Sequence, residues 1–308
     1  MKSKEPRFES QGKDFIKKIS NQCGSDFVSN YWRKQTLFIK GGSDITKELY
    51  NIDKFYCDYE KIDYHDWSFL IEIEKGKRNW KKVISKNCID DAKESQHSLA
   101  FMPLYIPDEK KKYISKEINF FINMYHQISN YLMPSFPSDN KWEWISSGVD
   151  MFISDNKGTI GGHYDTGDVF YFILEGEKEW VVEKKPDFEF CQKLAKEQGI
   201  SALSNQDLAP RNEYDRILLK PGDILYVPPL TYHRVTSRGK SLAASIGLPA
   251  FNEVSYLRYM ADLFKDEGEL LIPFPSYPRE YSDLNKNSHS EFIERMRKTL
   301  EKLNVETI

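Results

Sequence analysis

The sequence predicts a mostly β protein with flanking helices, built around an antiparallel barrel or jelly roll. Between residues 142 and 250, short β-rich runs follow one another without alternating helices. Gly, Pro, Asn and Asp separate these runs, as in tightly turning β-sheets. Helical periodicity appears before and after this stretch. We therefore expect a barrel over residues 141–250, a helix-and-strand elaboration over 1–140 and a helical segment over 251–308.

The runs inside the barrel region have the length and composition of strands. They are Val149–Ser154, Val169–Leu174, Glu179–Val182, Ile224–Val227 and Leu242–Leu248. Tight turns are expected at Glu175-Gly176 and at Pro221-Gly222-Asp223. A polar stretch, residues 185–215, interrupts the pattern and should form a partly helical insertion.

The flanking regions contain helical patterns and one short strand. Thr36–Ile39 is a strand-like run that ends at two glycines. Apolar residues recur at helical spacing from Ile114 to Leu132, Asp108 is a candidate cap for that helix, and Pro134 ends it. Two further apolar stripes follow residue 250. They are Tyr256, Met260 and Phe264, and then Phe292, Ile293, Met296, Leu300 and Leu303.

Composition limits the classes of function. With 40% hydrophobic and 30% charged residues, the 308-residue chain should fold as a soluble globule. The net charge of 44 − 47 = −3 gives no electrostatic reason to expect a nucleic-acid partner. The four cysteines form no CxxC pair, which argues against a zinc knuckle or a disulfide framework. Without a signal-like start or a long apolar run, we expect a cytoplasmic protein that does not enter a membrane.

Two of the six histidines stand two residues before an acidic residue. His289 and Glu291 lie where a helix begins, and side chains at i and i+2 on a helix point in different directions. His163 and Asp165 follow a Gly-Gly break and precede a β-rich run. On a strand, residues i and i+2 share a face, so an imidazole and a carboxylate can converge there on one ion.

His233 is the candidate third ligand. It follows a turn, a short strand and a second turn in LKPGDILYVPPLTYH, which places it at the start of a strand. Two histidines and one carboxylate with open metal positions form the facial triad of non-haem iron oxygenases. A zinc site is the competing interpretation, because hydrolytic zinc enzymes use the same ligands. The simplest alternative is that His163 and His233 are hydrogen-bonded core residues.

Two segments resemble the JmjC family, especially its ribosomal-oxygenase and asparaginyl-hydroxylase-like branch. They are HYDTGDVFYFILEGEKEW (His163–Trp180) and LKPGDILYVPPLTYH (Leu219–His233). The upstream stretch NYWRKQTLFIKGG (Asn30–Gly42) resembles the family's entry into its first strand. The resemblance implies a double-stranded β-helix of the cupin type, with catalytic metal ligands His163, Asp165 and His233. It also implies iron(II), 2-oxoglutarate and molecular oxygen, with hydroxylation that releases succinate and carbon dioxide.

The same resemblance assigns residues to the co-substrate. Family members carry a lysine or arginine that pairs with the distal carboxylate of 2-oxoglutarate, and Lys178 matches that position. Without the resemblance, Lys178 would be taken for a solvated lysine in a hairpin. Ser245 matches a polar position on the last barrel strand that helps to hold the co-substrate.

The family also suggests partners. Its related branches act on protein residues, so the expected substrate is an amino-acid side chain in a peptide or protein, and the C-terminal stripes suggest a homodimer. Bacterial ribosomal oxygenases carry a further domain after the dimerisation segment, whereas 308 − 250 = 58 residues remain here. A free amino acid or natural-product intermediate is the alternative substrate. The rival classes are a non-catalytic metal-binding cupin and a zinc or manganese isomerase or hydrolase.

Overall fold

The computed structural model places most of the chain up to residue 249. The residues that it describes are 8–42, 50–62, 68–82, 98–103, 106, 112, 114–133, 148–249 and 297. The chain divides into two compact units, Met1–Ala250 and Phe251–Ile308. The predicted C-terminal helices therefore lie outside the described residues, as does the proposed dimerisation surface.

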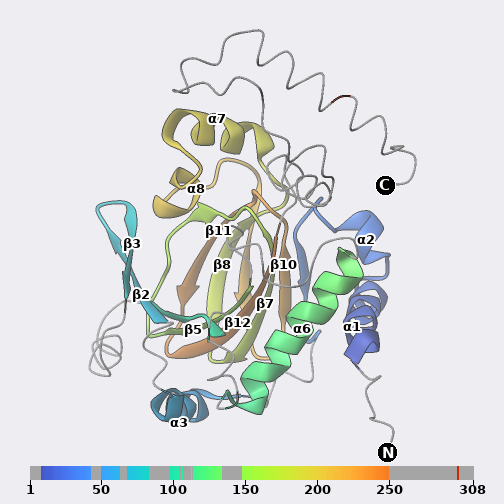
Figure 1. Ribbon diagram of the computed structural model, residues 1–308. Helices are drawn as coiled ribbons and strands as arrows, with labels where there is room; N and C mark the ends of the chain where they lie inside the picture. The colour runs from blue at the N-terminus through green and yellow to red at the C-terminus, as the bar shows by residue number, and fades with distance from the viewer. Residues whose placement is uncertain are drawn as a thin grey trace, which may run out of the picture. The chain divides into compact units, whose positions relative to one another are not determined.

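Two antiparallel sheets form the core of the first unit (Figure 1). The larger sheet has the order β1-β10-β7-β12-β5-β4-β2-β3. Its strands are β1 Leu37–Ile39, β2 Ser68–Glu74, β3 Lys77–Lys82, β4 Ser98–Phe101, β5 Gly148–Ser154, β7 Asp168–Glu175, β10 Ile224–Val227 and β12 Ser241–Leu248. The smaller sheet has the order β6-β11-β8-β9. Its strands are β6 His163–Tyr164, β8 Lys178–Glu183, β9 Tyr214–Leu219 and β11 Tyr232–Ser237.

The inner faces of the two sheets share one apolar core. Trp180, Val182 and Val235 come from the smaller sheet, and Tyr171 and Leu225 from the larger, within a single buried cluster. Sheets that bury their inner faces against each other form a sandwich or a flattened barrel. The prediction of a mostly β protein with a double-stranded β-helix core is therefore confirmed.

Local chemistry fixes the turns between the barrel strands. Gly176, in the predicted turn between β7 and β8, has φ +75°. A Cβ atom at this position would lie 2.2 Å from the carbonyl oxygen of Lys240, so only glycine fits. The predicted turn before β10 contains Gly222 in the same left-handed region. Each of these turns carries the chain from one sheet to the other, from β7 to β8 and from β9 to β10.

Helices cover the outer face of the larger sheet. They are α1 Phe8–Cys23, α2 Phe27–Asn30, α3 Ile52–Ile62 and α6 Lys116–Leu132. Figure 1 shows α1 and α6 side by side on this face, and Ile19 and Phe121 share a buried cluster with Phe170 and Phe172 of β7. The predicted helix up to Leu132 is present, but its cap is Ser115, whose side chain accepts from the backbone of Ile118. The suggested cap Asp108 lies outside the described residues.

The polar stretch 185–215 is partly helical, as predicted. It contains α7 Phe188–Gln198 and α8 Ala202–Asn205, which connect β8 to β9. Cys191, Leu194 and Leu203 pack there against Tyr164 and Tyr232 of the smaller sheet. The insertion therefore braces the strands that carry the two histidines. Nowhere in the part of the chain that the structure describes is a helix long and apolar enough to cross a bilayer.

Candidate metal centre

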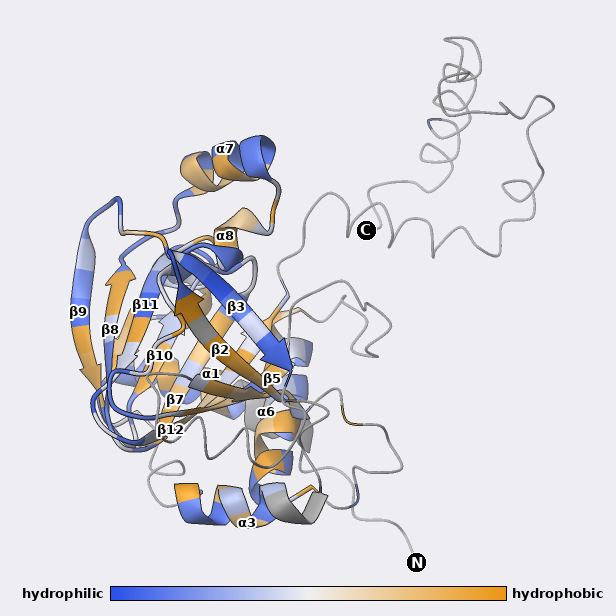
Figure 2. Ribbon diagram, turned by 90° about the vertical axis from the view of Figure 1, so that its left-hand side faces the viewer, coloured by the Kyte–Doolittle hydropathy of each residue, from blue (hydrophilic) through white to orange (hydrophobic). Residues whose placement is uncertain are grey.

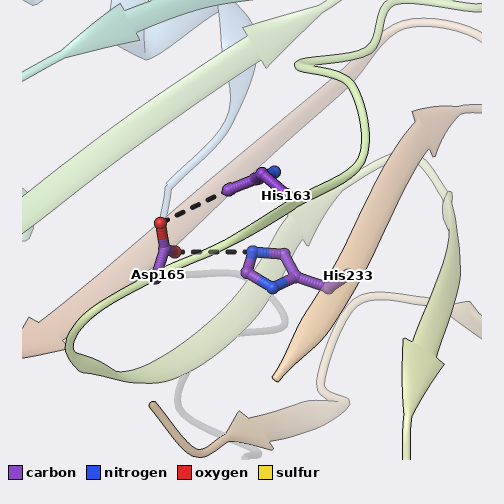
Figure 3. A group of neighbouring side chains, drawn as sticks. All are labelled: His163, Asp165 and His233. Atoms are coloured by element: carbon purple, nitrogen blue, oxygen red, sulfur yellow. Dashed lines mark ion pairs between the residues drawn. The ribbon is translucent and has the colours of Figure 1, made fainter. Parts of the chain in front are cut away.

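Two adjacent strands bring the two predicted histidine ligands together. His163 on β6 and His233 on β11 are direct partners in the antiparallel register, so their side chains leave the sheet on the same face. Their ring centroids lie 4.1 Å apart. Asp165 follows β6 by one residue and turns its carboxylate back toward both rings (Figure 3).

The three side chains form a compact set of metal-ligand atoms. The Nε2 atom of His163 lies 3.5 Å from Oδ1 of Asp165, and Nε2 of His233 lies 3.4 Å from Oδ2. One ligand atom from each residue can be chosen so that all three lie within 4.8 Å of one another. His163 and His233 are buried, whereas the Asp165 side chain is 38% exposed. The open side of the cluster is therefore the side of the carboxylate.

Backbone carbonyl groups fix the tautomer of both rings. Nδ1 of His163 lies 3.1 Å from the carbonyl oxygen of Gly161, and Nδ1 of His233 lies 3.1 Å from that of Thr231. A carbonyl oxygen only accepts hydrogen bonds, so each Nδ1 carries the proton and each Nε2 keeps its lone pair. This arrangement is typical of metal-binding histidines, whose second nitrogen donates to the backbone.

Electrostatics keeps these residues in the protonation states that a metal requires. Burial, Arg78 and His233 hold the pKa of His163 well below its ordinary value. Burial alone would raise the pKa of Asp165, but His163, His233 and Arg78 outweigh it and lower that pKa. At neutral pH the cluster therefore offers a neutral imidazole at His163 and a carboxylate. Divalent metals bind these deprotonated forms.

Close packing leaves little freedom around the ligands. A Cβ atom at Gly162 would lie 2.3 Å from Oη of Tyr232 and 2.4 Å from the carbonyl oxygen of Leu208. Gly162 is thus required before His163, because β11 and the loop that follows α8 lie too close for a side chain. Trp180 stacks on the His233 ring, with centroids 5.6 Å apart and an interplanar angle of 23°. The imidazole orientation is therefore fixed by stacking as well as by its hydrogen bond.

Lys178 lies deeper in the same barrel. It is the first residue of β8 and only 3% exposed, so the alternative of a solvated hairpin lysine is wrong. Its Nζ donates to Oγ of Ser154 at 2.9 Å, and Ser154 in turn lies 2.8 Å from Oγ of Ser98. No acidic group lies within ion-pairing distance of Lys178 in the described ranges. Burial lowers the pKa of this lysine to about 7.

Ser245 lies on the opposite wall. It is buried on β12, directly between Asp150 of β5 and Tyr171 of β7 in the register. Since Tyr171 belongs to the inner core, this row of three side chains faces the barrel interior. Burial, with a smaller contribution from the charge of Asp165, raises the pKa of Asp150 to about 7.

Sequence reasoning missed Asp150, Ser154 and Arg78. The first two had a usable signal, because Asp150 and Ser154 are polar residues on one face of the otherwise apolar strand GVDMFIS. Arg78 had no such sequence signal, since it lies among lysines in KRNWKK. Only its burial in the fold distinguishes it from the exposed residues around it.

Comparison with known proteins supports the resemblance of the barrel region to the JmjC family. Residues 132–256 match the family model described as JmjC domain. A Haemophilus influenzae protein described as a probable ribosomal oxygenase is 24% identical over 226 residues, which cover 72% of this chain and 48% of that protein. Ribosomal oxygenase 2 of Bos taurus is 31% identical over 101 residues, or 32% of this chain and 20% of that one. The chain thus spans about half or less of the length of these curated relatives.

Solved structures agree on the fold. A crystal structure of YcfD from Escherichia coli has a TM-score of 0.57 and 20% identity, and covers 89% of this chain and 67% of its own. A second structure is of YcfD, described as a ribosomal oxygenase, in complex with cobalt and 2-oxoglutarate. It has a TM-score of 0.56 and 19% identity, and the match covers 89% of this chain and 66% of that one. The chain therefore shares the fold of these proteins.

Proposed function

We propose that this protein is an iron(II)- and 2-oxoglutarate-dependent dioxygenase that hydroxylates an amino-acid side chain of a protein. The observation that carries the proposal is the pairing of two sites inside one barrel. His163, Asp165 and His233 cluster on one side of the interior. Lys178 lies on β8, the strand that pairs with β11, with no acidic partner among the described residues. A divalent metal and a dicarboxylate fit these two sites together.

The donor set fits iron(II). Two imidazole nitrogens and one carboxylate on a single face leave open metal positions, as non-haem oxygenases require. Zinc remains the competing metal for the same ligands, and Lys178 favours the oxygenase, because a zinc hydrolase has no need of a buried cation there. Bound iron would supply oxygen activation coupled to decarboxylation of 2-oxoglutarate. The protein's own task is to hold the ligands, orient the co-substrate and exclude water.

Lys178 is proposed to bind the distal carboxylate of 2-oxoglutarate. Its register partner on β11 is Ser237, four residues beyond His233 on the same face. At about 3.4 Å per residue, this separation is about 14 Å along the strand, which leaves room for an extended five-carbon dicarboxylate between the metal and the Lys178 side chain. Ser154 is proposed to donate to the same carboxylate, and Ser245 lines the opposite wall. The role of Ser245 stays a prediction from the resemblance.

A protein substrate is supported by the relatives and by the architecture. Both curated relatives are described as ribosomal oxygenases. Residues 1–140 are proposed to build the walls around the mouth of the site, with the insertion 185–215 as another wall. We further propose a cytoplasmic homodimer assembled through residues 251–308. Light scattering of the intact chain and of a version ending at Pro249 tests the dimer, and a monomeric intact chain would refute it.

Two measurements test the activity. The purified protein, loaded with iron(II), is supplied with 2-oxoglutarate and oxygen, and succinate is measured with and without a cell lysate. Peptides from the lysate are then searched for the gain of one oxygen atom. We expect succinate formation coupled to a modified peptide. If only a small metabolite drives succinate formation, the substrate is a free amino acid or a natural-product intermediate instead. If iron and 2-oxoglutarate yield no succinate at all, the oxygenase assignment fails.

A further inference from the structure

Arg78 is a buried cation on an otherwise hydrophilic edge strand. β3 is the last strand of the larger sheet, and Figure 2 shows it as a hydrophilic strand beside the hydrophobic β2. Lys77 and Trp80 of this strand are exposed, but Arg78 is only 6% exposed. Burial lowers the pKa of its guanidinium to about 10, so the group is still charged at neutral pH. A buried charge normally has a partner.

The hairpin of β2 and β3 is tied to the segment that leads into His163. Nε of Arg78 donates to the carbonyl oxygen of Ile160 at 2.7 Å. At the hairpin's turn, the carbonyl oxygen of Gly76 accepts from the backbone of Asp207 at 2.7 Å. Asp207 also accepts from the backbone of Gly162, the residue before His163. The guanidinium of Arg78 is thereby held against the segment that precedes His163.

One donor of this guanidinium is left over. Nη2 of Arg78 is buried and has no hydrogen-bond partner in the described structure. The two negative charges that act on it are Asp165 and Asp207. Oδ1 of Asp207 is already engaged by Arg234 and by the backbone of Gly162. Asp165 is the other negative group that acts on Arg78, and its effect is the larger of the two.

In this structure the Asp165 carboxylate faces the two histidines and forms no ion pair with Arg78. Its two carboxylate oxygens each face one histidine Nε2, at 3.5 and 3.4 Å. If one oxygen and both Nε2 atoms held a metal, the second oxygen would no longer face a histidine. That oxygen then needs a donor, because metal-binding carboxylates are themselves hydrogen-bonded by the surrounding protein.

We propose that Arg78 is a positioning residue of the metal site, whose Nη2 donates to the Asp165 oxygen that does not bind the metal. This inference rests on the proposed metal site. The contact orients the carboxylate, and it satisfies a buried donor that the protein otherwise leaves unpaired. The β2–β3 hairpin is therefore part of the metal site although it supplies no ligand.

Cobalt(II) binding without 2-oxoglutarate tests the proposal, since the cobalt absorption spectrum reports both affinity and ligand geometry. Arg78→Gln should weaken cobalt binding by about 10–100-fold and change the spectrum at saturating cobalt. Arg78→Lys, which keeps the charge but has a single donor nitrogen, should recover part of the loss. Lys77→Gln, an exposed neighbour on the same strand, should bind cobalt like the parent. If Arg78→Gln fails to fold, as thermal melting will reveal, Arg78→Lys decides: parental affinity and spectrum refute the proposal.

A second comparison separates orientation of Asp165 from simple support of the loop. Asp207→Ala removes the hydrogen bond from the backbone of Gly162, before His163, but removes no donor to Asp165. An equal loss of cobalt affinity in Asp207→Ala and Arg78→Gln would mean that both residues only hold the loop, which refutes the proposal. Parental cobalt affinity in Arg78→Gln with weaker 2-oxoglutarate binding would assign Arg78 to the co-substrate. If the parent itself binds no cobalt, the metal site fails rather than this inference.

Discussion

The two charged sites inside the barrel differ in how their charges are balanced. At the metal end, Asp165 lies between two histidines, so the negative charge already has polar neighbours, and its side chain is 38% exposed. At the other end, the Lys178 ammonium group has only the neutral hydroxyl of Ser154 as its hydrogen-bond partner and is nearly inaccessible. One end is a partly open cluster of metal-ligand atoms, and the other is a closed environment around a cation.

This difference shows where ligand-binding energy would be released. A buried charge without a counter-charge is costly, and a ligand of opposite sign removes that cost on binding. The metal end is preorganised by hydrogen bonds from the rings to the backbone. The lysine end is instead preorganised by burial, and only a ligand that carries its own negative charge completes it.

The largest effect is expected at the metal end. His233→Ala removes one of three ligands, and two ligands hold a divalent metal poorly, so iron binding and turnover should be lost. Equilibrium dialysis with iron(II) under anaerobic conditions and the succinate assay measure both. His126→Ala, on helix α6, is the matched histidine control and should behave like the parent. Parental metal binding by His233→Ala would show that the cluster is only a hydrogen-bonded core.

A somewhat smaller effect is expected at the lysine end. Lys178→Ala leaves the distal carboxylate of 2-oxoglutarate buried and unpaired, which costs about 3–5 kcal/mol. The affinity for 2-oxoglutarate should therefore fall by roughly a hundredfold or more, while the affinity for the metal is unchanged. Calorimetric titration of the cobalt-loaded protein measures this, with the exposed Lys184→Ala as control. An unchanged affinity would remove Lys178 from the co-substrate site.

The barrel and its ligand cluster were predictable because their determinants are local. The strand residues, the turn glycines and the spacing of His163 and Asp165 are all encoded within short stretches. The strand over Ile224–Val227 has the predicted ends, and the run at Val149–Ser154 begins one residue earlier in the structure. His233 could be paired with His163 only through context, and the register between β6 and β11 supplies that pairing.

The walls of the site were not predictable, since they depend on contacts between distant parts of the chain. Arg78 reaches Ile160 across 82 positions, and Arg33 pairs with Asp168 across 135. Nothing in the local sequence separates Arg78 from the exposed lysines beside it. The same limit applies to Lys178, whose burial follows from the packing of one sheet on the other. Its role had to be taken from family resemblance.

The pH dependence of 2-oxoglutarate binding sharpens the comparison. The pKa of Lys178 is lowered to about 7 in the ligand-free protein, so this lysine loses its proton as the pH rises through that value. A bound carboxylate favours the protonated form, and binding should take up a proton. The affinity should therefore fall above pH 7, by up to about tenfold per pH unit.

Lys178→Arg separates this lysine from other titrating groups. An arginine stays charged, so the pH dependence above neutrality should largely disappear in this variant. Asp150, whose pKa is raised to about 7, is present in both proteins, and its contribution cancels in the comparison. Equal pH profiles for parent and Lys178→Arg would assign the titration to Asp150 or to another group.

The smallest effect concerns the stability of the ligand-free protein. The folded pKa of Lys178 lies below its ordinary value of 10.5, so at neutral pH the unfolded chain binds more protons at this site than the folded protein. Burial of Lys178 therefore destabilises the ligand-free fold at neutral pH, and the penalty disappears as the pH rises from about 7 toward 10.5.

Lys178→Met fills the same space without a charge, and its melting temperature at pH 7 should exceed the parent's by a few degrees. The difference should shrink at pH 9. Saturating 2-oxoglutarate and cobalt should reverse it, since only the parent gains an ion pair from the ligand. A Lys178→Met protein that melts below the parent without ligand would mean that the hydrogen bond to Ser154 outweighs the burial of the charge.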